Sequence, residues 1–318
     1  MTSATPGQVM DMGFSIRVAD AADRGDVISL CRDSLLAEDT ADVDGLTRLL
    51  WEAPDGGDAL RLVAHVGSRL VGACFGTLGI GSDLAISGSV TLIAVQSDIR
   101  RAGIGRALLA ELEAQLRMGG ATEVSTGAGQ PHYWWPGIDV QYQAALEFFG
   151  SSGYGKPEEI VNMMVALSRP VVTGPRPGGM EIRRLTTAEA PEFLRWMEMT
   201  WGPEWAREVQ LALARDPISC HVARENGDYI GFAGYDTNRL GWFGPMGTSP
   251  AARGRGVGAT LLRCCLRDYL DRGEVECQVA WVGPRDFYRV AVSAQVGRTF
   301  VRMRKAMASA LPSTALSR

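Results

Sequence analysis

Two short loops that combine arginine with glycine are the strongest chemical signal in this sequence of 318 residues. They read RRAGIG at 100–105 and RGRGVG at 253–258, so the same kind of loop recurs 153 positions later. Each precedes an amphipathic helix, whose free N–H groups and dipole attract anions. Glycine lets a phosphate approach the backbone closely, and arginine adds positive charge. The pattern predicts a phosphate site at one loop or both, formed by Arg100, Arg101, Gly103, Ile104, Gly105 and Arg106, and by Arg253, Gly254, Arg255, Gly256, Val257, Gly258 and Ala259.

A glycine-rich turn with solvated arginines is the simplest alternative for either loop alone. Recurrence in the same strand–loop–helix context favours phosphate binding over that alternative. The loops do not fit the dinucleotide pattern GxGxxG, which is accompanied by an acidic residue about 20 positions later in a βαβ unit. The Walker loop GxxxxGK followed by Ser or Thr does not occur either.

The same order of strand and helix signals surrounds both loops. Each half begins with a short strand pattern and a helical stretch, continues with a hairpin, and reaches its loop through another strand. Apolar residues at helical spacing predict an amphipathic helix after each loop. The predicted matching elements are the strands 15–18 with 181–184, 60–66 with 221–224, 70–77 with 229–235, 89–95 with 241–247 and 123–126 with 275–282, and the helices 104–116 with 257–269.

An internal repeat of this length predicts two domains of the α+β class. The segment 168–179 (SRPVVTGPRPGG) holds three prolines and three glycines without periodicity, which indicates a linker. We therefore predict an N-terminal domain at 14–170, a linker at 171–178 and a C-terminal domain at 179–310.

Length and composition agree with two globular domains. Hydrophobic residues make up 46% and charged residues 21% of the chain, enough apolar side chain for a core in each half. A net charge of -4 argues against nucleic acid as a partner, because polyanions are bound by a surplus of Lys and Arg. The six cysteines form no CxxC pair and accompany only three histidines, so neither a disulfide framework nor a metal site is expected.

Targeting signals are not evident in the sequence. No apolar run approaches the roughly 18 residues that a membrane helix needs, and residues 1–12 lack the charged and apolar blocks of a signal peptide. We expect a soluble cytoplasmic protein that is a monomer or homodimer and does not bind a membrane.

In their strand and helix context, the two loops resemble the acetyl-CoA-binding motif of the GNAT superfamily, Arg or Gln-x-x-Gly-x-Gly or Ala. The resemblance covers about residues 14–170 and 179–308. It implies two tandem GNAT acetyltransferase domains, each a mixed, mostly antiparallel sheet flanked by helices, with acetyl-CoA as cofactor. It also implies that the strand before each loop splays from its neighbour and pairs with pantetheine. That role falls on Ile93 and Val95 in one half, and on Met246 and Thr248 in the other. Gly247, between these two, is a further predicted cofactor-binding residue.

The resemblance further implies direct attack of an amine on the thioester, with a base for the ammonium proton and an acid for the departing thiolate. In the family the acid is often a tyrosine, in a pattern close to Phe-Tyr-x-x-x-Gly-Phe, and the match falls on Tyr288 after Phe287. The N-terminal half has phenylalanine there, in EFFGSSGY at 147–154. We expect the C-terminal domain to be catalytic and the N-terminal domain to bind cofactor without turnover. The alternative for Tyr288 is a half-buried aromatic on an amphipathic helix.

Within the superfamily, the tandem arrangement and the segments 133–139 (YWWPGID) and 281–300 look most like two-domain glucosamine or glucosaminide N-acetyltransferases. The acceptor pocket in such folds is usually lined by the first two helices and their loop. Aromatic faces suit sugar rings and carboxylates suit ammonium groups, although ordinary helix packing explains the same residues. The substrate candidates are Trp201, Glu204, Trp205 and Asp236.

The sequence does not identify a single residue as the general base. Asp236, Glu204 and Asp216 are candidates by region, and a water chain is an alternative. The sequence predicts an acetyl-CoA-dependent N-acetyltransferase that acts on a primary amine of a small molecule, an amino sugar or aminoglycoside-like compound, which is compatible with antibiotic resistance. Two rival hypotheses are acetylation of a peptide or protein amine, and a non-catalytic CoA-binding regulatory protein.

Overall fold

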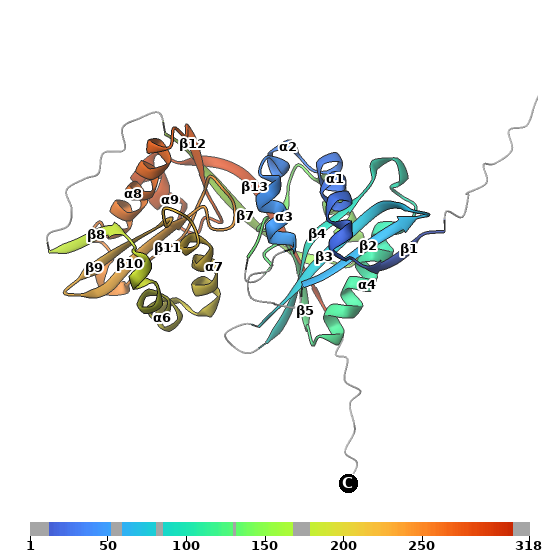
Figure 1. The fold of residues 1–318 in the computed structure, drawn as a ribbon, viewed down its shortest axis with the longest axis horizontal. Helices are drawn as coiled ribbons and strands as arrows, with labels where there is room; N and C mark the ends of the chain where they lie inside the picture. The colour runs from blue at the N-terminus through green and yellow to red at the C-terminus, as the bar shows by residue number, and fades with distance from the viewer. Residues whose placement is uncertain (1–12, 52–58, 81–84, 130–131, 168–178, 308–318) are drawn as a thin grey trace, which may run out of the picture.

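The computed structural model describes residues 13–51, 59–80, 85–129, 132–167 and 179–307. The predicted linker at 171–178 lies outside these ranges. The described chain forms two halves of similar make-up that lie side by side (Figure 1). None of the described helices is long and apolar enough to cross a lipid bilayer.

The N-terminal half contains strands and helices in mixed order. Its elements are β1 (Ser15–Val18), α1 (Arg24–Ser34), α2 (Ala37–Thr40), α3 (Val43–Trp51), β2 (Ala59–Val66), β3 (Arg69–Ile80), β4 (Ile86–Val95), α4 (Ile104–Met118), β5 (Glu123–Thr126), β6 (Ile138–Asp139), α5 (Gln143–Ser151) and β7 (Gly155–Ala166).

The C-terminal half repeats this order with a shorter connection before its last helix. Its elements are β8 (Met180–Arg184), α6 (Ala190–Trp201), α7 (Pro203–Leu213), β9 (Cys220–Glu225), β10 (Asp228–Tyr235), β11 (Trp242–Thr248), α8 (Val257–Asp271), β12 (Glu276–Val279), α9 (Arg285–Val292) and β13 (Gln295–Ala306). Every strand and helix predicted around the two loops is present, and the α+β class is confirmed. The strand predicted at 275–282 is shorter, because Trp281 has a left-handed φ of 46° that extended backbone does not allow.

The thirteen described strands form one continuous sheet rather than two separate ones. The order along its main path is β1-β2-β3-β4-β5-β13-β7-β12-β11-β10-β9-β8, and β6 pairs with β13. The pairs β4–β5 and β11–β12 are parallel, whereas the other neighbours among the described strands are antiparallel.

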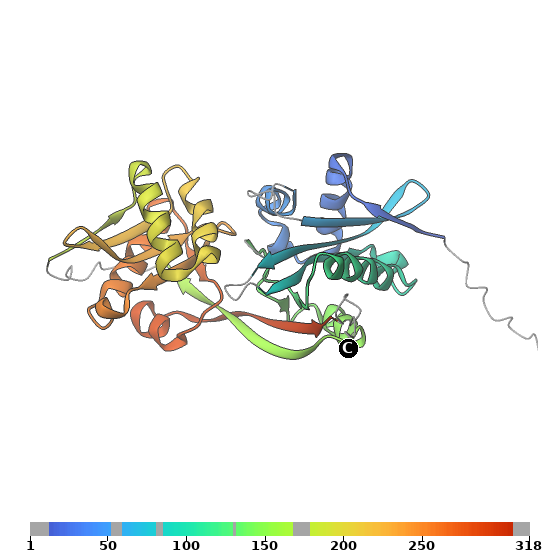
Figure 2. The same cartoon turned by 90° about the horizontal axis from the view of Figure 1, so that it is seen from below.

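The two halves exchange their last strands, which the sequence did not predict. Strand β13 of the C-terminal half pairs with β5, placing Ala306 opposite Glu123. Strand β7 of the N-terminal half pairs with β12, placing Ala166 opposite Glu276. Figure 2 shows both strands crossing between the halves. The registers are equivalent, so the exchange follows the internal repeat.

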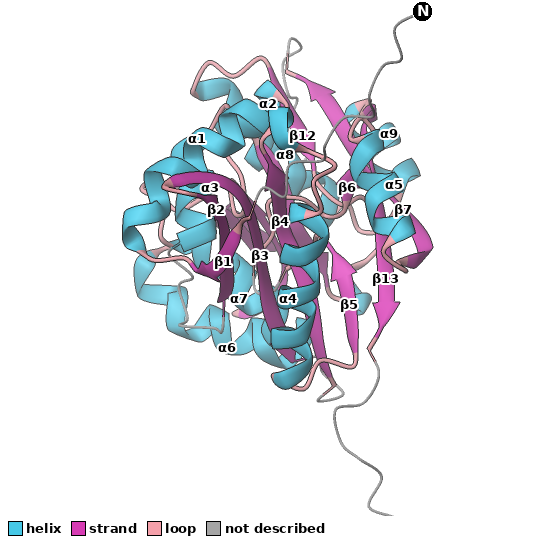
Figure 3. Cartoon of the chain, turned by 90° about the vertical axis from the view of Figure 1, so that its right-hand side faces the viewer, coloured by secondary structure: helices cyan, strands magenta, loops and turns pink. Residues whose placement is uncertain are grey.

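Helices cover both faces of each half. In the N-terminal half, α1 and α3 lie on one face of the sheet and α4 on the other (Figures 2 and 3). Helix α4 packs through Leu108, Leu112 and Leu116, each at most 2% exposed. Helix α8 packs in the same way through Leu261 and Leu262. These apolar stripes hold the preceding loops at a fixed place on the sheet.

Candidate active site

Each half contains a gap where two parallel strands part. Strands β4 and β5 are paired only over residues 87–90 of β4, and β11 and β12 are paired only through Trp242 and Phe243 of β11. Beyond these points, the described residues offer β4 and β11 no partner on that edge. The predicted cofactor-binding residues of the two strands all lie on the unpaired stretches, at Ile93 and Val95, and at Met246, Gly247 and Thr248.

The two arginine and glycine loops have nearly the same backbone conformation. Gly103 has a φ of 85° and Gly256 a φ of 80°, and each caps the N-terminus of the helix that follows. Arg101 has a φ of 71° at the position where the second loop has Gly254, with a φ of 73°. Left-handed residues alternating with helical ones turn successive N–H groups toward a common point, which favours an anion. The strained Arg101 is therefore a candidate functional residue.

The first arginine of each loop has an equivalent hydrogen bond. Arg100 Nε donates to the carbonyl of Val95 at 2.9 Å, and Arg253 Nε donates to the carbonyl of Thr248 at 3.3 Å. These contacts fix each loop to the end of the preceding strand. Arg255 is instead engaged with Glu225 through two hydrogen bonds of 2.6 and 3.0 Å.

A cavity of about 750 Å³ adjoins the gap in the N-terminal half. It is lined by β4 from Val90 to Val95, by Phe148 and Phe149 of α5, and by Tyr142. It also brings together all the cofactor-binding residues predicted in this half, namely Ile93, Val95, Arg100, Arg101, Gly103, Ile104, Gly105 and Arg106. The sequence placed the loop correctly but gave no measure of the space beside it.

Side chains lie closer to the gap in the C-terminal half. A Cβ added at Gly247 would lie 2.6 Å from the ring of Trp201, so the indole rests directly on β11. A Cβ added at Gly258 would lie 3.2 Å from Thr248 Oγ1 and 3.6 Å from the Phe287 ring. The absence of a side chain at Gly247 and Gly258 therefore lets Trp201 and the start of α8 pack closely against β11.

Tyr288 lies beside the point where β11 and β12 part. It is 7% exposed and its ring is 6.3 Å from that of Phe243, the last residue of β11 paired with β12. Burial raises the pKa of Tyr288 to about 12. Its hydroxyl has no hydrogen bond to another described residue, whereas the corresponding position in the first half is the buried Phe149.

The predicted substrate residues divide into two groups. Trp201 and Trp205 stack with ring centres 5.3 Å apart and planes at 13°, and the buried indole N–H of Trp201 has no hydrogen-bond partner among the described residues. Glu204 is partly exposed on α7 beside them. A buried donor without a partner costs free energy of folding. The Trp201 N–H is therefore available to donate a hydrogen bond to a bound ligand.

Asp236 lies apart from that group in a saturated network. It is 1% exposed, and it accepts hydrogen bonds from the Gly241 N–H at 2.7 Å, the Tyr269 hydroxyl at 3.0 Å and Arg272 at 2.7 Å. Its carboxylate is occupied by the protein, which favours a structural role for the turn after β10. Asp216, the other acidic candidate for the base, is exposed.

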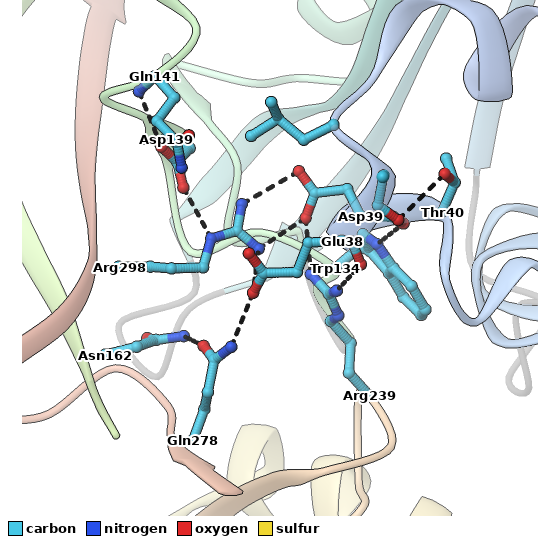
Figure 4. A network of polar contacts seen from close by, with 12 residues as sticks. Glu38, Asp39, Thr40, Trp134, Asp139, Gln141, Asn162, Arg239, Gln278 and Arg298 are labelled. Atoms are coloured by element: carbon cyan, nitrogen blue, oxygen red, sulfur yellow. Dashed lines mark hydrogen bonds and ion pairs between the residues drawn. The ribbon is translucent and has the colours of Figure 1, made fainter. Parts of the chain in front are cut away.

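A buried charge network that the sequence did not indicate joins the halves (Figure 4). Arg298 on the exchanged strand β13 donates to Asp39 at 2.7 and 3.1 Å and to Asp139 at 2.7 Å. Arg239 and the Tyr142 hydroxyl also donate to Asp39, at 2.9 and 2.7 Å. Burial alone would raise the pKa of Asp39, but the two arginines lower it overall. Since Asp139 and Tyr142 line the cavity, the C-terminal half helps to build the N-terminal site.

Comparison with known proteins agrees with this architecture. A family model described as the acetyltransferase (GNAT) family matches residues 182–291. That segment contains the second gap and loop, and the match identifies the C-terminal domain as a GNAT acetyltransferase domain. With the first gap and loop, the fold is that of two tandem GNAT domains. No curated protein matches the chain.

Solved structures with similar folds include one that is described as a tandem protein. A glucosamine N-acetyltransferase region in a fungal multi-domain GH3 beta-N-acetylglucosaminidase shares 19% identity at a TM-score of 0.75, over 93% of this chain and 38% of that one. The chain thus spans well under half of that protein. A tandem GNAT protein from the clavulanic acid biosynthesis pathway shares 19% identity at 0.68, over 92% and 98% of the two chains. A GCN5-related N-acetyltransferase from Sphaerobacter thermophilus shares 22% at 0.61, over 92% and 95%.

Proposed function

We propose that this protein transfers an acetyl group from acetyl-CoA to a primary amine of a small molecule, and that the C-terminal domain performs the transfer. The observation that carries the proposal is the duplicated gap, in which an unpaired strand edge runs into an anion-binding loop at a helix N-terminus. The family match over residues 182–291 supports this assignment for the second copy.

The residues present fit acetyl-CoA, which supplies an acetyl group activated as a thioester. In this proposal the N–H groups of 100–105 and 253–258 bind the pyrophosphate, and the free edges of β4 and β11 pair with the pantetheine. The cavity of about 750 Å³ beside β4 lies within the usual size range of ligand sites. We propose that the N-terminal domain binds acetyl-CoA without turnover, because Phe149 offers no proton.

Tyr288 is our candidate general acid for the C-terminal domain. Its raised pKa keeps the hydroxyl protonated at neutral pH, and its proton is not committed to another described residue. Its position beside Phe243 is at the inner end of the gap, away from the loop. The alternative is that Tyr288 only packs against its neighbours. Mutation of Tyr288 distinguishes this packing role from the general-acid role.

An amino sugar or aminoglycoside-like compound is the substrate class that we propose. The stacked pair Trp201 and Trp205 offers aromatic faces for a sugar ring, and Glu204 offers a carboxylate for an ammonium group. The likeness to a structure described as a glucosamine N-acetyltransferase region supports this choice at the level of the fold.

A panel of acceptors with acetyl-CoA tests the proposal. Thiol release would be followed with glucosamine, an aminoglycoside, a peptide with a free N-terminus, and no acceptor. Preference for the amino sugars supports the proposal, and preference for the peptide favours the rival protein N-acetyltransferase. Acetyl-CoA binding with no thiol release from any acceptor would point to a non-catalytic CoA-binding protein.

A further inference from the structure

A glutamate on α7 lies between the two halves without a cationic partner. Glu208 is partly exposed, and its Oε1 accepts a hydrogen bond of 2.6 Å from the side-chain amide of Asn238. The Oδ1 atom of that amide accepts a hydrogen bond of 3.2 Å from the backbone N–H of Tyr133, which belongs to the N-terminal half. Among the described residues, Glu208 forms no ion pair. A carboxylate in packed surroundings without a cation is costly for folding, so it calls for a functional explanation.

These residues adjoin both sides of the second gap. The Tyr133 ring packs edge-on against Trp281 at 5.4 Å, and Trp281 lies shortly after the end of β12 at Val279. On the other side, Thr237, which precedes Asn238, donates a hydrogen bond of 2.6 Å to the carbonyl of Gly244, the first unpaired residue of β11. Glu208 is thus hydrogen-bonded to Asn238, whose neighbours Tyr133 and Thr237 contact Trp281 and β11, so it lies near the inner end of the gap.

The inner end of the gap is where the acetyl group belongs if the proposed function is correct. The phosphate-binding loop 253–258 follows the outer end of β11, beyond Thr248. A cofactor whose pyrophosphate lies at that loop and whose pantetheine follows β11 must have its thioester toward Gly244. An acceptor amine has to approach from the same end.

The surroundings of Glu208 suit proton transfer near neutral pH. Desolvation raises the pKa of Glu208 to about 7, and the hydrogen bond from Asn238 opposes that rise only in part. The pKa of Tyr133 is raised well above its usual value by burial and by the charge of Glu208. The other titratable groups on the adjoining elements are Glu204 and Arg207 on α7, His132 before Tyr133, and Asp236 and Arg239 beside Asn238. Asp236 is paired with Arg272, and Arg239 is paired with Asp39. A base is most effective when its pKa is close to the working pH.

We propose that Glu208 is the general base for the acceptor amine, at an acceptor site that Tyr133 of the N-terminal half and Trp281 of the C-terminal half complete. This inference rests on the proposed function and names the acceptor side of the same site. Glu208 removes one proton from the ammonium and later releases it to solvent. The C–N bond forms as the C–S bond breaks, Tyr288 gives its proton to the departing sulfur, and the second proton of the attacking nitrogen restores the tyrosine.

The test is a pH profile of kcat/KM for glucosamine with saturating acetyl-CoA. We expect the wild type to lose activity below about pH 7 through Glu208, in addition to the loss that protonation of glucosamine causes in every variant. Glu208→Gln should lower kcat/KM by about 10²- to 10⁴-fold and remove the contribution of this group. The control Glu274→Gln changes an exposed glutamate outside the site and should match the wild type.

Asn238→Ala keeps the test decisive if Glu208→Gln does not fold. Loss of the amide donor should move the Glu208 step of the pH profile to higher pH, which a purely structural role would not do. An unshifted step in folded Asn238→Ala, or wild-type activity in folded Glu208→Gln, would overturn the inference. Either result contradicts the role of Glu208 but leaves the proposed function intact. If the wild type released no thiol with any amine of the panel, the proposed function itself would be wrong.

The melting temperature checks the environment of Glu208 without using activity. Because the folded pKa is raised from 4.5 to about 7, the folded state favours the protonated carboxyl, and stability is lost as pH rises through that window. Glu208→Gln should therefore melt above the wild type at pH 8 and equally at pH 4.5. A variant that melts below the wild type at pH 8 would show that Glu208 is charged and stabilising there, against the proposal.

Discussion

In the N-terminal half the gap beside β4 adjoins a cavity of about 750 Å³, whereas in the C-terminal half the indole of Trp201 rests on Gly247 of β11. The loops themselves are nearly identical in backbone conformation. The N-terminal half has Phe149 where the C-terminal half has Tyr288. The difference teaches that two copies of the same loop can differ in two separate properties, the space beside the strand edge and the presence of a group that can donate a proton.

The strongest way to break this comparison is to block each loop in turn. Gly258→Glu places a carboxylate where the pyrophosphate must approach, and should lower turnover on the order of 10²-fold or more through misplacement of the cofactor. Gly105→Glu should leave most of the turnover and remove one acetyl-CoA from the stoichiometry measured by calorimetry. If Gly105→Glu alone abolished turnover in a folded protein, the N-terminal half would be the catalytic one.

The dependence of the N-terminal half on its neighbour is tested by Arg298→Met. The change leaves Asp39 and Asp139, both at most 1% exposed, short of a buried cation, so the free energy of unfolding should fall by about 3–5 kcal/mol. Arg304→Met on the same strand is the control. The side chains of its partners Glu158 and Glu123 are 46% and 43% exposed, so the expected loss is about 0–1 kcal/mol. Equal losses in urea denaturation would mean that the buried network contributes no more than a surface pair.

A smaller effect is expected from Tyr288→Phe, which gives the C-terminal half the residue type of the N-terminal one. Positioned proton transfer contributes about 10²- to 10⁴-fold, so kcat should fall at least about tenfold while acetyl-CoA affinity and melting temperature stay unchanged. The defect should shrink toward pH 9, because a thiol with a pKa of about 8.5 leaves more easily as thiolate there. An unchanged kcat at neutral pH, with chemistry shown to be rate-limiting, would make Tyr288 a packing residue.

The sequence was sufficient for features that depend on neighbouring residues. The strands before the loops, the helices after them and the loops themselves rest on local hydrophobic periodicity and turn chemistry. The separation of the strand before each loop from its neighbour was predicted only through the family resemblance of the loops 100–105 and 253–258. Hydrophobic periodicity and turn residues can be read within one element, without knowing which distant segments that element contacts.

Features that depend on remote partners were beyond the sequence. Strands β7 and β13 each suit several neighbours, so their exchange could not be read from either one. Arg298 is 259 positions from Asp39 in the sequence. The residues next to Arg298 do not indicate that it forms a buried ion pair. Asp236 was predicted as a substrate residue, but its partners Tyr269 and Arg272 lie at the end of α8 and occupy its carboxylate. The domain division at 171–178 stays a proposal, since strand pairing crosses it on both sides.

The exchange of strands also sets an order of events during translation. Strand β5 pairs with Arg304–Ala306 at the end of β13, so the first half leaves the ribosome with an exposed strand edge and, without Arg298, an incomplete charge network around Asp39. Exposed edges recruit other chains, so the first half is prone to pair with another chain until β13 has been made. Synthesis of β13 covers this strand edge and supplies Arg298. The N-terminal half is made first, but it can complete its fold only after the C-terminal half has been made.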